Sequence, residues 1–336
     1  MCDYIILDLP QNLDGSYNDT SYAFLRRRTT GSKYLFPISL PGGNLIASLV
    51  NNQTFLRSAR DIRSALPLHG FGILDELTFL STITTAGVQY ALWQYLSRFY
   101  DRFVFTMTSA GVHRNDVVNF FAFKPFRLTT RWDVYEEVLA FLKRAAVHLV
   151  IIVTVTSEDN PLVQPSSAWS TSCLPHSNET SMKEAVRLLS RVPQPTFNFT
   201  LTLSLRMDLF EGVGVPLGGN NLSYIPCHAH RSFRYAEQCH AQVYGHDPNG
   251  STIEYVAGGG CAFAKGGVGA NDVVSFETPT TVAYKMKRAY HALGYAKTAT
   301  HIMGWSLFNF SGGLAPPQCN GGRDRINAIL KVLSDN

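Results

Sequence analysis

The sequence lacks any uninterrupted apolar run of about 18 residues, the length that a membrane-spanning helix needs. The apolar stretch at residues 147–155 is shorter and is typical of a buried strand. Charge is also sparse: 16% of residues are charged, the net charge is +4, and residues 26–28 form the only dense basic run. Such a short run is typical of a solvated surface. We therefore expect no membrane span and no nucleic-acid partner.

No signal peptide pattern is present either, because the chain reads as a strand from residue 4 onward. Seven N-x-S/T sequons nevertheless exceed chance, and six cysteines fit an oxidising compartment. We therefore expect a secreted, extracellular glycoprotein, for which this sequence either begins at the mature N-terminus or lacks its N-terminal part. Asn198 and Asn309 lie in or beside strand-like segments. The sequons expected to carry glycans start at Asn18, Asn52, Asn178, Asn221 and Asn249.

The hydrophobic pattern predicts a recurrent strand-then-helix arrangement. Seven apolar segments without strict alternation, typical of buried parallel strands, lie at residues 4–9, 34–40, 72–77, 103–108, 149–156, 199–205 and 302–308. Helical patterns lie at residues 54–65, 89–100, 132–146, 181–189, 280–293 and 324–333. Repeated strand–helix units over this length predict an α/β fold of the (β/α) barrel type.

One long interval interrupts this alternation. About 70 residues rich in Gly, Tyr, His and Asn separate the sixth of these strands from the helix that begins near Thr280. We interpret residues 208–279 as an inserted α+β subdomain, and residues 1–207 and 280–336 as the barrel.

Short motifs with a shared order carry a resemblance to a known family. They are residues 2–6 (C-D-Y-I-I), 36–44 (F-P-I-S-L-P-G-G-N), 70–78 (G-F-G-I-L-D-E-L-T), 106–111 (T-M-T-S-A-G), 201–206 (L-T-L-S-L-R), 235–239 (Y-A-E-Q-C), 304–307 (G-W-S-L) and 319–322 (C-N-G-G). In this order they resemble family 18 glycoside hydrolases, the chitinases and chitinase-like proteins. The resemblance implies a (β/α)8 TIM barrel of chitinase type whose first strand is absent from this chain. A divergent protein with another way of closing the sheet remains the alternative.

The resemblance also implies a lost catalytic acid. The family's fourth strand reads roughly D-G-x-D-x-D-x-E, and its last Glu protonates the glycosidic oxygen in a substrate-assisted reaction. Aligning Gly72 with the motif Gly places Leu74, Glu76 and Thr78 at the two aspartates and the acid. Threonine cannot donate a proton as a carboxylic acid does.

The sixth strand shows a second departure from the family pattern. The family's M-T-Y-D is replaced by V-T-V-T at residues 153–156, which removes both the Tyr and the Asp. The resemblance therefore implies catalytic inactivity. An unusual route that uses Glu76 or Glu158 stays open.

The family motifs for sugar binding are partly retained in this sequence. The resemblance places Trp305 under a pyranose ring and Arg206 near the sugar, while Met107, Glu76 and Thr156 line the same cavity. We therefore expect a protein that binds chitin or N-acetylglucosamine-type glycans without hydrolysing them, and no cofactor. The alternatives are an active or weakly active glycoside hydrolase and a signalling scaffold that binds a protein partner and no sugar.

The cysteines and histidines leave one further alternative. The resemblance pairs Cys239 with Cys319 in a disulfide, whereas the pairing of Cys2, Cys173, Cys227 and Cys261 stays open. Residues 227–230 and 239–240 also group cysteine with histidine, which zinc favours, but their spacing matches no standard zinc finger. We therefore expect no metal site.

Overall fold

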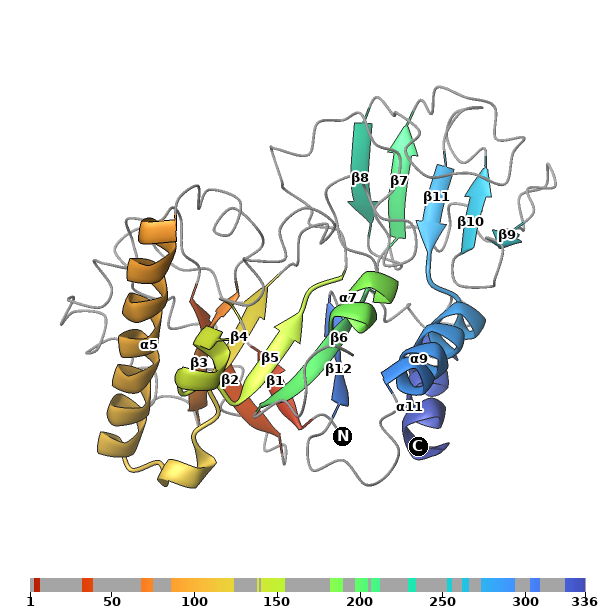
Figure 1. The fold of residues 1–336 in the computed structure, drawn as a ribbon. Helices are drawn as coiled ribbons and strands as arrows, with labels where there is room; N and C mark the ends of the chain where they lie inside the picture. The colour runs from red at the N-terminus through yellow and green to blue at the C-terminus, as the bar shows by residue number, and fades with distance from the viewer. Residues whose placement is uncertain are drawn as a thin grey trace. The chain divides into compact units, whose positions relative to one another are not determined.

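The computed structural model (Figure 1) describes residues 3–6, 32–38, 68–74, 86–123, 138, 140–154, 182–189, 197–204, 207–211, 229–233, 253–255, 262–265, 273–293, 303–308 and 324–335. The chain forms two compact units. Unit 1 comprises Met1–Phe123, Arg131–Ile151 and Pro195–Phe199. Unit 2 comprises Lys124–Thr130, Ile152–Gln194 and Thr200–Asn336.

A seven-stranded sheet in the order β1-β2-β3-β4-β5-β6-β12 forms the framework of the fold. Its strands are β1 (Tyr4–Ile6), β2 (Lys33–Ile38), β3 (Leu68–Leu74), β4 (Phe120–Phe123), β5 (Leu149–Ile152), β6 (Asn198–Ser204) and β12 (Met303–Phe308). The pairs β1–β2, β2–β3 and β3–β4 are parallel. Neighbouring strands follow the order of the sequence, as successive strand–helix units require. This confirms the predicted α/β class with parallel strands.

One predicted strand is wrong. Residues 103–108 lie inside α5 (Ala86–Ser109), and the strand at this point of the sheet is β4. The β-branched and aromatic residues of this segment favour a strand locally, but Leu96, Phe99, Phe103 and Met107 are buried at helical spacing. Phe105, between them, is 67% exposed. Burial of one helix face has overridden the local preference.

Aromatic rings join α5 to the sheet in unit 1. Phe103 stacks on Phe71 of β3 with ring centroids 4.9 Å apart and meets Phe99 edge-to-face at 4.2 Å. Trp93 stacks on Phe141 at 4.9 Å. These rings are almost wholly buried, so they form the hydrophobic core between the helix and strands β3 and β4.

Strand β3 begins four residues earlier than the predicted strand at residues 72–77. Gly70 and Gly72 lie inside it, where β4 approaches very closely. A Cβ atom at Gly70 would lie 1.9 Å from the carbonyl oxygen of Val118, and one at Gly72 would lie 2.2 Å from that of Phe120. The glycines therefore permit close approach of the backbones and do not mark the start of the strand.

Asn119 connects three segments of unit 1 just before β4. Its amide group donates to the carbonyl oxygens of Tyr100 (3.4 Å) and Ala146 (3.2 Å), and its side-chain oxygen accepts from the N–H of Phe71 (3.4 Å). Its backbone N–H donates to Nδ1 of His148 at 3.1 Å. Asn119 is fully buried, and these bonds satisfy its polar groups.

A second sheet is antiparallel and has five strands in the order β8-β7-β11-β10-β9. These are β7 (Met207–Glu211), β8 (Ala229–Phe233), β9 (Ile253–Tyr255), β10 (Ala262–Lys265) and β11 (Val273–Phe276). They fall between β6 and α9 (Pro279–Leu293), the interval in which we predicted an inserted subdomain. The proposed boundaries at residues 208 and 279 remain predictions.

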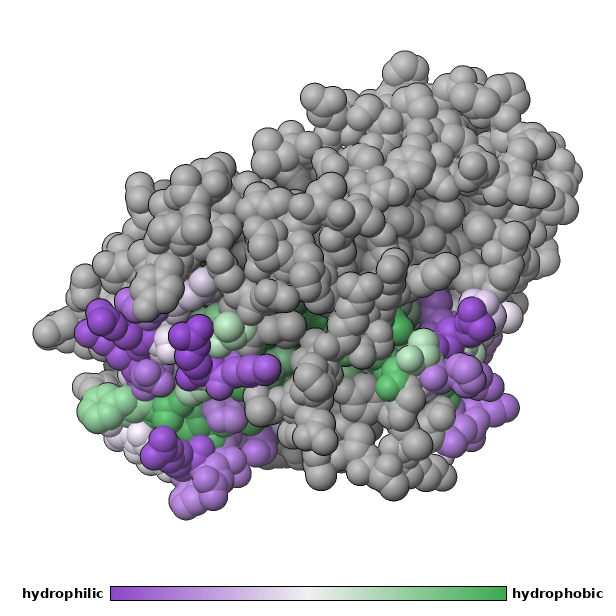
Figure 2. Space-filling view, in the orientation of Figure 1, coloured by the Kyte–Doolittle hydropathy of each residue, from purple (hydrophilic) through white to green (hydrophobic). Residues whose placement is uncertain are grey.

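The remaining helical elements are η1 (Arg114–Asp116), α7 (Met182–Leu189) and α11 (Asp324–Asp335). Residues 138 and 140–144 are also helical, inside the predicted helix at residues 132–146, whereas the predicted helix at residues 54–65 lies outside the described residues. Hydrophilic residues cover much of the described surface around α5, with hydrophobic ones between them (Figure 2). None of the described helices has the length and apolarity to cross a membrane.

Candidate functional site

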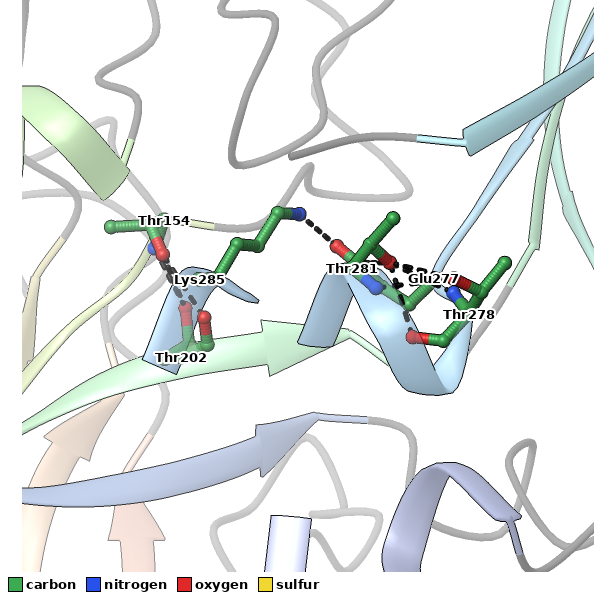
Figure 3. Close-up of polar contacts among 6 residues, drawn as sticks. All are labelled: Thr154, Thr202, Glu277, Thr278, Thr281 and Lys285. Carbon is green, nitrogen blue, oxygen red and sulfur yellow. Dashed lines mark hydrogen bonds and ion pairs between the residues drawn. The ribbon is translucent and has the colours of Figure 1, made fainter. Parts of the chain in front are cut away.

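The carboxyl ends of β5 and β6 are joined through two threonines of unit 2. The backbone N–H of Thr154 donates to the hydroxyl oxygen of Thr202 at 2.7 Å, and the Thr154 hydroxyl donates to the Thr202 carbonyl at 3.1 Å. Figure 3 shows the contacts between the two side chains, and both residues are buried. Ligands of open and closed parallel sheets bind beyond the carboxyl ends of the strands, so this is the end that concerns function.

The same face of β6 continues toward β12. Thr200 lies two residues before Thr202 on this face, and its hydroxyl is 2.6 Å from that of Ser306. We call Thr154, Thr202, Thr200 and Ser306 the hydroxyl row. Its members bond to one another and carry no charge. A hydroxyl does not protonate a glycosidic oxygen as a carboxylic acid does, so the row holds strands together and offers no general acid.

Trp305 lies on the other face of β12, because successive strand residues point to opposite sides. Its indole N–H donates to the hydroxyl oxygen of Tyr290 in α9 at 3.0 Å. The two rings meet edge-to-face, with centroids 5.9 Å apart and planes at 73°. Both residues are partly exposed. We call this the Tyr290–Trp305 pair.

Partial burial raises the pKa of Tyr290 above its usual value, and the bond from the Trp305 indole opposes this shift. The phenol therefore stays protonated across the neutral and mildly alkaline range. Among the residues that the structure describes, none accepts the proton of this hydroxyl. The pair thus combines a fixed aromatic ring with one neutral O–H donor.

A buried ionic cluster lies where β11 ends and α9 begins. Glu277 forms an ion pair with Lys285, and their side chains are 8% and 5% exposed. The Thr281 hydroxyl donates to Glu277 at 2.8 Å. Thr278 and Thr281 each accept the other's backbone N–H, at 2.9 and 3.1 Å, which caps the first turn of the helix. Figure 3 shows the cluster extending along one side of α9. Glu277 thus bonds to both Lys285 and Thr281, as in a structural network.

The described residues include few of the predicted site. Trp305 is placed as above, and Leu74 is the last residue of β3. Met107 was predicted on a barrel strand, but it lies in α5 with no exposed surface, so its assignment to a sugar cavity is withdrawn. The other predicted residues lie outside the described residues: Glu76, Thr78, Thr156, Glu158, Arg206, Cys239, Cys319 and the expected glycosylation sites.

Sequence reasoning missed the hydroxyl row, Tyr290 and the buried pair Glu277–Lys285. Alternating threonines at Thr200 and Thr202 would have indicated one polar face on β6, and the T-x-x-T spacing of Thr278 and Thr281 a helix start. No comparable signal indicated that Tyr290 contacts Trp305. Within the described residues, no three His, Cys, Asp or Glu side chains lie close enough to hold a metal.

Parallel strands that follow the sequence order across the sheet, with helices between them, are typical of the α/β barrel class. Comparison with solved structures narrows this class: the chain has the TIM-barrel fold of the family 18 glycoside hydrolases and chitinase-like proteins. No sequence-family model matches the chain, and no curated protein is similar to it in sequence.

Three of these structures illustrate the range of the fold. Human YKL-39, described as a pseudo-chitinase with retained chitooligosaccharide binding, is 11% identical with a TM-score of 0.64 over 99% of this chain and 91% of that one. A chitinase-like agglutinin from Robinia pseudoacacia is 11% identical, with a TM-score of 0.61 over 97% and 93%. A class V chitinase from Nicotiana tobaccum is 11% identical, with a TM-score of 0.62 over 97% of both chains.

Proposed function

We propose that this chain is a secreted chitinase-like protein that binds N-acetylglucosamine-type oligosaccharides without hydrolysing them. The observation that carries the proposal is the end of β5. There Thr154 is bonded to Thr202, and the next two positions, Tyr and Asp in the family motif, are Val155 and Thr156. The fold is shared with a pseudo-chitinase that keeps chitooligosaccharide binding and with a chitinase-like agglutinin.

The loss of hydrolysis follows from the chemistry of the replaced groups. Thr78 stands at the position of the acid, so nothing there protonates the leaving oxygen. Removing a positioned acid or base costs about 10²–10⁴ in rate, and the orienting Tyr and Asp of the family's sixth strand are replaced as well. Binding without turnover is the behaviour that remains.

Trp305 supplies the proposed sugar contact. The edge of its indole ring forms a hydrogen bond with Tyr290, so the two ring faces lie outside that contact. Trp305 is also partly exposed. Pyranose rings present apolar C–H faces that pack on such aromatic surfaces. Arg206 and Thr156 are proposed as further contacts on the family pattern alone.

The test is a calorimetric titration of the full chain with a tetramer of N-acetylglucosamine, alongside an assay for released reducing ends. We expect saturable binding, no release, and at least tenfold weaker binding by Trp305→Ala, as expected of an aromatic anchor. Phe105→Ala serves as the control variant, because it also removes an aromatic ring, here an exposed one on α5 that has no part in the proposed site.

Two outcomes would contradict the proposal in different ways. Release of reducing ends that requires Glu76 or Glu158 would make the protein a hydrolase. No heat of binding from a folded sample would leave a protein-binding scaffold as the better interpretation.

A further inference from the structure

Within the part of the chain that the structure describes, the Tyr290–Trp305 pair has a hydrogen-bond pattern that leaves one donor available. The indole N–H has a single hydrogen, and Tyr290 accepts it at 3.0 Å. A tyrosine hydroxyl can accept and donate at the same time, and none of the described residues takes the Tyr290 proton. What the pair offers to a ligand is therefore an aromatic surface beside one O–H group.

The hydroxyl row offers nothing comparable. Thr154 bonds to Thr202, and Thr200 bonds to Ser306, so each of these hydroxyls already has a partner within the sheet, and the row has no aromatic surface. Thr202 has no exposed surface and Thr200 is 9% exposed. Ser306 and Trp305 are also on opposite faces of β12. A ligand that stacks on Trp305 therefore meets Tyr290 and not the row.

We propose that Tyr290 is a second ligand-binding residue, which fixes the Trp305 ring by accepting its indole proton and donates its own hydroxyl proton to an oxygen of the bound sugar. This inference rests on the proposed function. The acceptor is a neutral oxygen, either a ring-substituent hydroxyl or an acetamido carbonyl, because a neutral phenol pairs with such groups at little desolvation cost.

Two consecutive hydrogen bonds, from Trp305 to Tyr290 and from Tyr290 to the sugar, strengthen the proposed contact. When the indole N–H donates to a hydroxyl, that hydroxyl becomes a better donor, since successive hydrogen bonds polarise one another. Burial keeps the phenol in its protonated, donating form, because the pKa of Tyr290 lies above its usual value. Tyr290 also lies in α9, a helix whose first turn is capped and ion-paired, so the hydroxyl is carried by a rigid element.

The experiment replaces Tyr290 with Phe, which keeps the ring and removes the hydroxyl. We expect Tyr290→Phe to weaken binding of the N-acetylglucosamine tetramer about 3- to 10-fold, the value of about one net hydrogen bond, in a chain that stays folded with a slightly lower melting temperature. The matched control is Tyr284→Phe in the same helix, because Tyr284 is 37% exposed and lies beside Arg288, outside the pair.

A spectroscopic measurement separates positioning from general damage. In a ¹H–¹⁵N spectrum, the indole N–H signal that disappears in Trp305→Phe should shift in Tyr290→Phe and stay in place in Tyr284→Phe. Wild-type protein that fails to bind the tetramer overturns the proposed function. Wild-type protein that binds, with Tyr290→Phe binding equally well, overturns the role of Tyr290 alone.

Discussion

At the residue scale, His148 illustrates how a single side chain can make stability depend on pH. Its Nδ1 atom accepts the backbone N–H of Asn119, which requires an unprotonated nitrogen at that position. Partial burial lowers the pKa of His148 below its usual value. The side chain keeps substantial exposure, so the solvent screens part of this effect.

The sign of the pH dependence follows from this direction. The folded chain binds the His148 proton less readily than the unfolded chain, so the contribution is fully present above the unfolded pKa of about 6.5. It is lost as pH falls through the lower folded value. We expect the free energy of unfolding in urea to fall between pH 7 and 5, and His148→Gln to reduce that slope. An equal slope in the variant would contradict the assignment.

The roles of single residues could be predicted only where a local motif assigned each residue a position. Thr78 and the V-T-V-T segment could be interpreted from the sequence, because a strand motif states which residue stands at each position. The bond between Thr154 and Thr202 could not, since it joins residues 48 positions apart and depends on the pairing of two strands. The contact of Trp305 with Tyr290 depends in the same way on how α9 packs.

At the scale of elements, the sequence predicted six of the seven sheet strands and failed where helix and strand signals overlap. The segment at residues 103–108 combines strand-favouring residues with a buried helical stripe that begins at Leu96. A 24-residue helix buries that stripe against β3 and β4, and this packing decides the outcome. The buried strand β4 was missed because four apolar residues are too short a signal.

The contact between β3 and β4 gives the element-scale prediction. Gly70→Ala places a methyl group against the Val118 backbone, which cannot move aside as a side chain can. We expect a loss of about 2–3 kcal/mol in the free energy of unfolding, the upper range for overpacking. Gly304→Ala is the control, since its methyl group would meet only the Thr200 side chain, at 3.1 Å. Equal losses in the two variants, measured by urea denaturation, would show that close approach is not the cause.

At the scale of the whole molecule, the order of the motifs along the chain predicted the barrel class. Regular alternation of strands and helices admits few topologies, so the sequence order of strands became their order in the sheet. The five-stranded sheet was expected only as an inserted α+β subdomain, because its short strands lack a strong period of their own. The local sequence did not indicate their pairing order.

The two units share strands, and this yields a prediction for unfolding. The division between the units falls inside β5, after Ile151, and inside β6, after Phe199. If one unit unfolded alone, β5 and β6 would each keep only part of their strand residues in the folded unit. We expect one cooperative transition, with coincident urea curves from far-ultraviolet circular dichroism and tryptophan fluorescence. Two separated midpoints would show that the units are independent.

The buried pair of Glu277 and Lys285 also constrains how this sequence can change over time. Replacing Lys285 alone removes the ion-pair partner of the buried Glu277, and breaking a buried pair costs about 3–5 kcal/mol, whereas a well-packed apolar pair in both places is often neutral. A single substitution at either position is therefore expected to destabilise the fold, whereas replacing both residues together by apolar ones need not. Lineages that drift apart in the rest of α9 should keep both charges or lose both together.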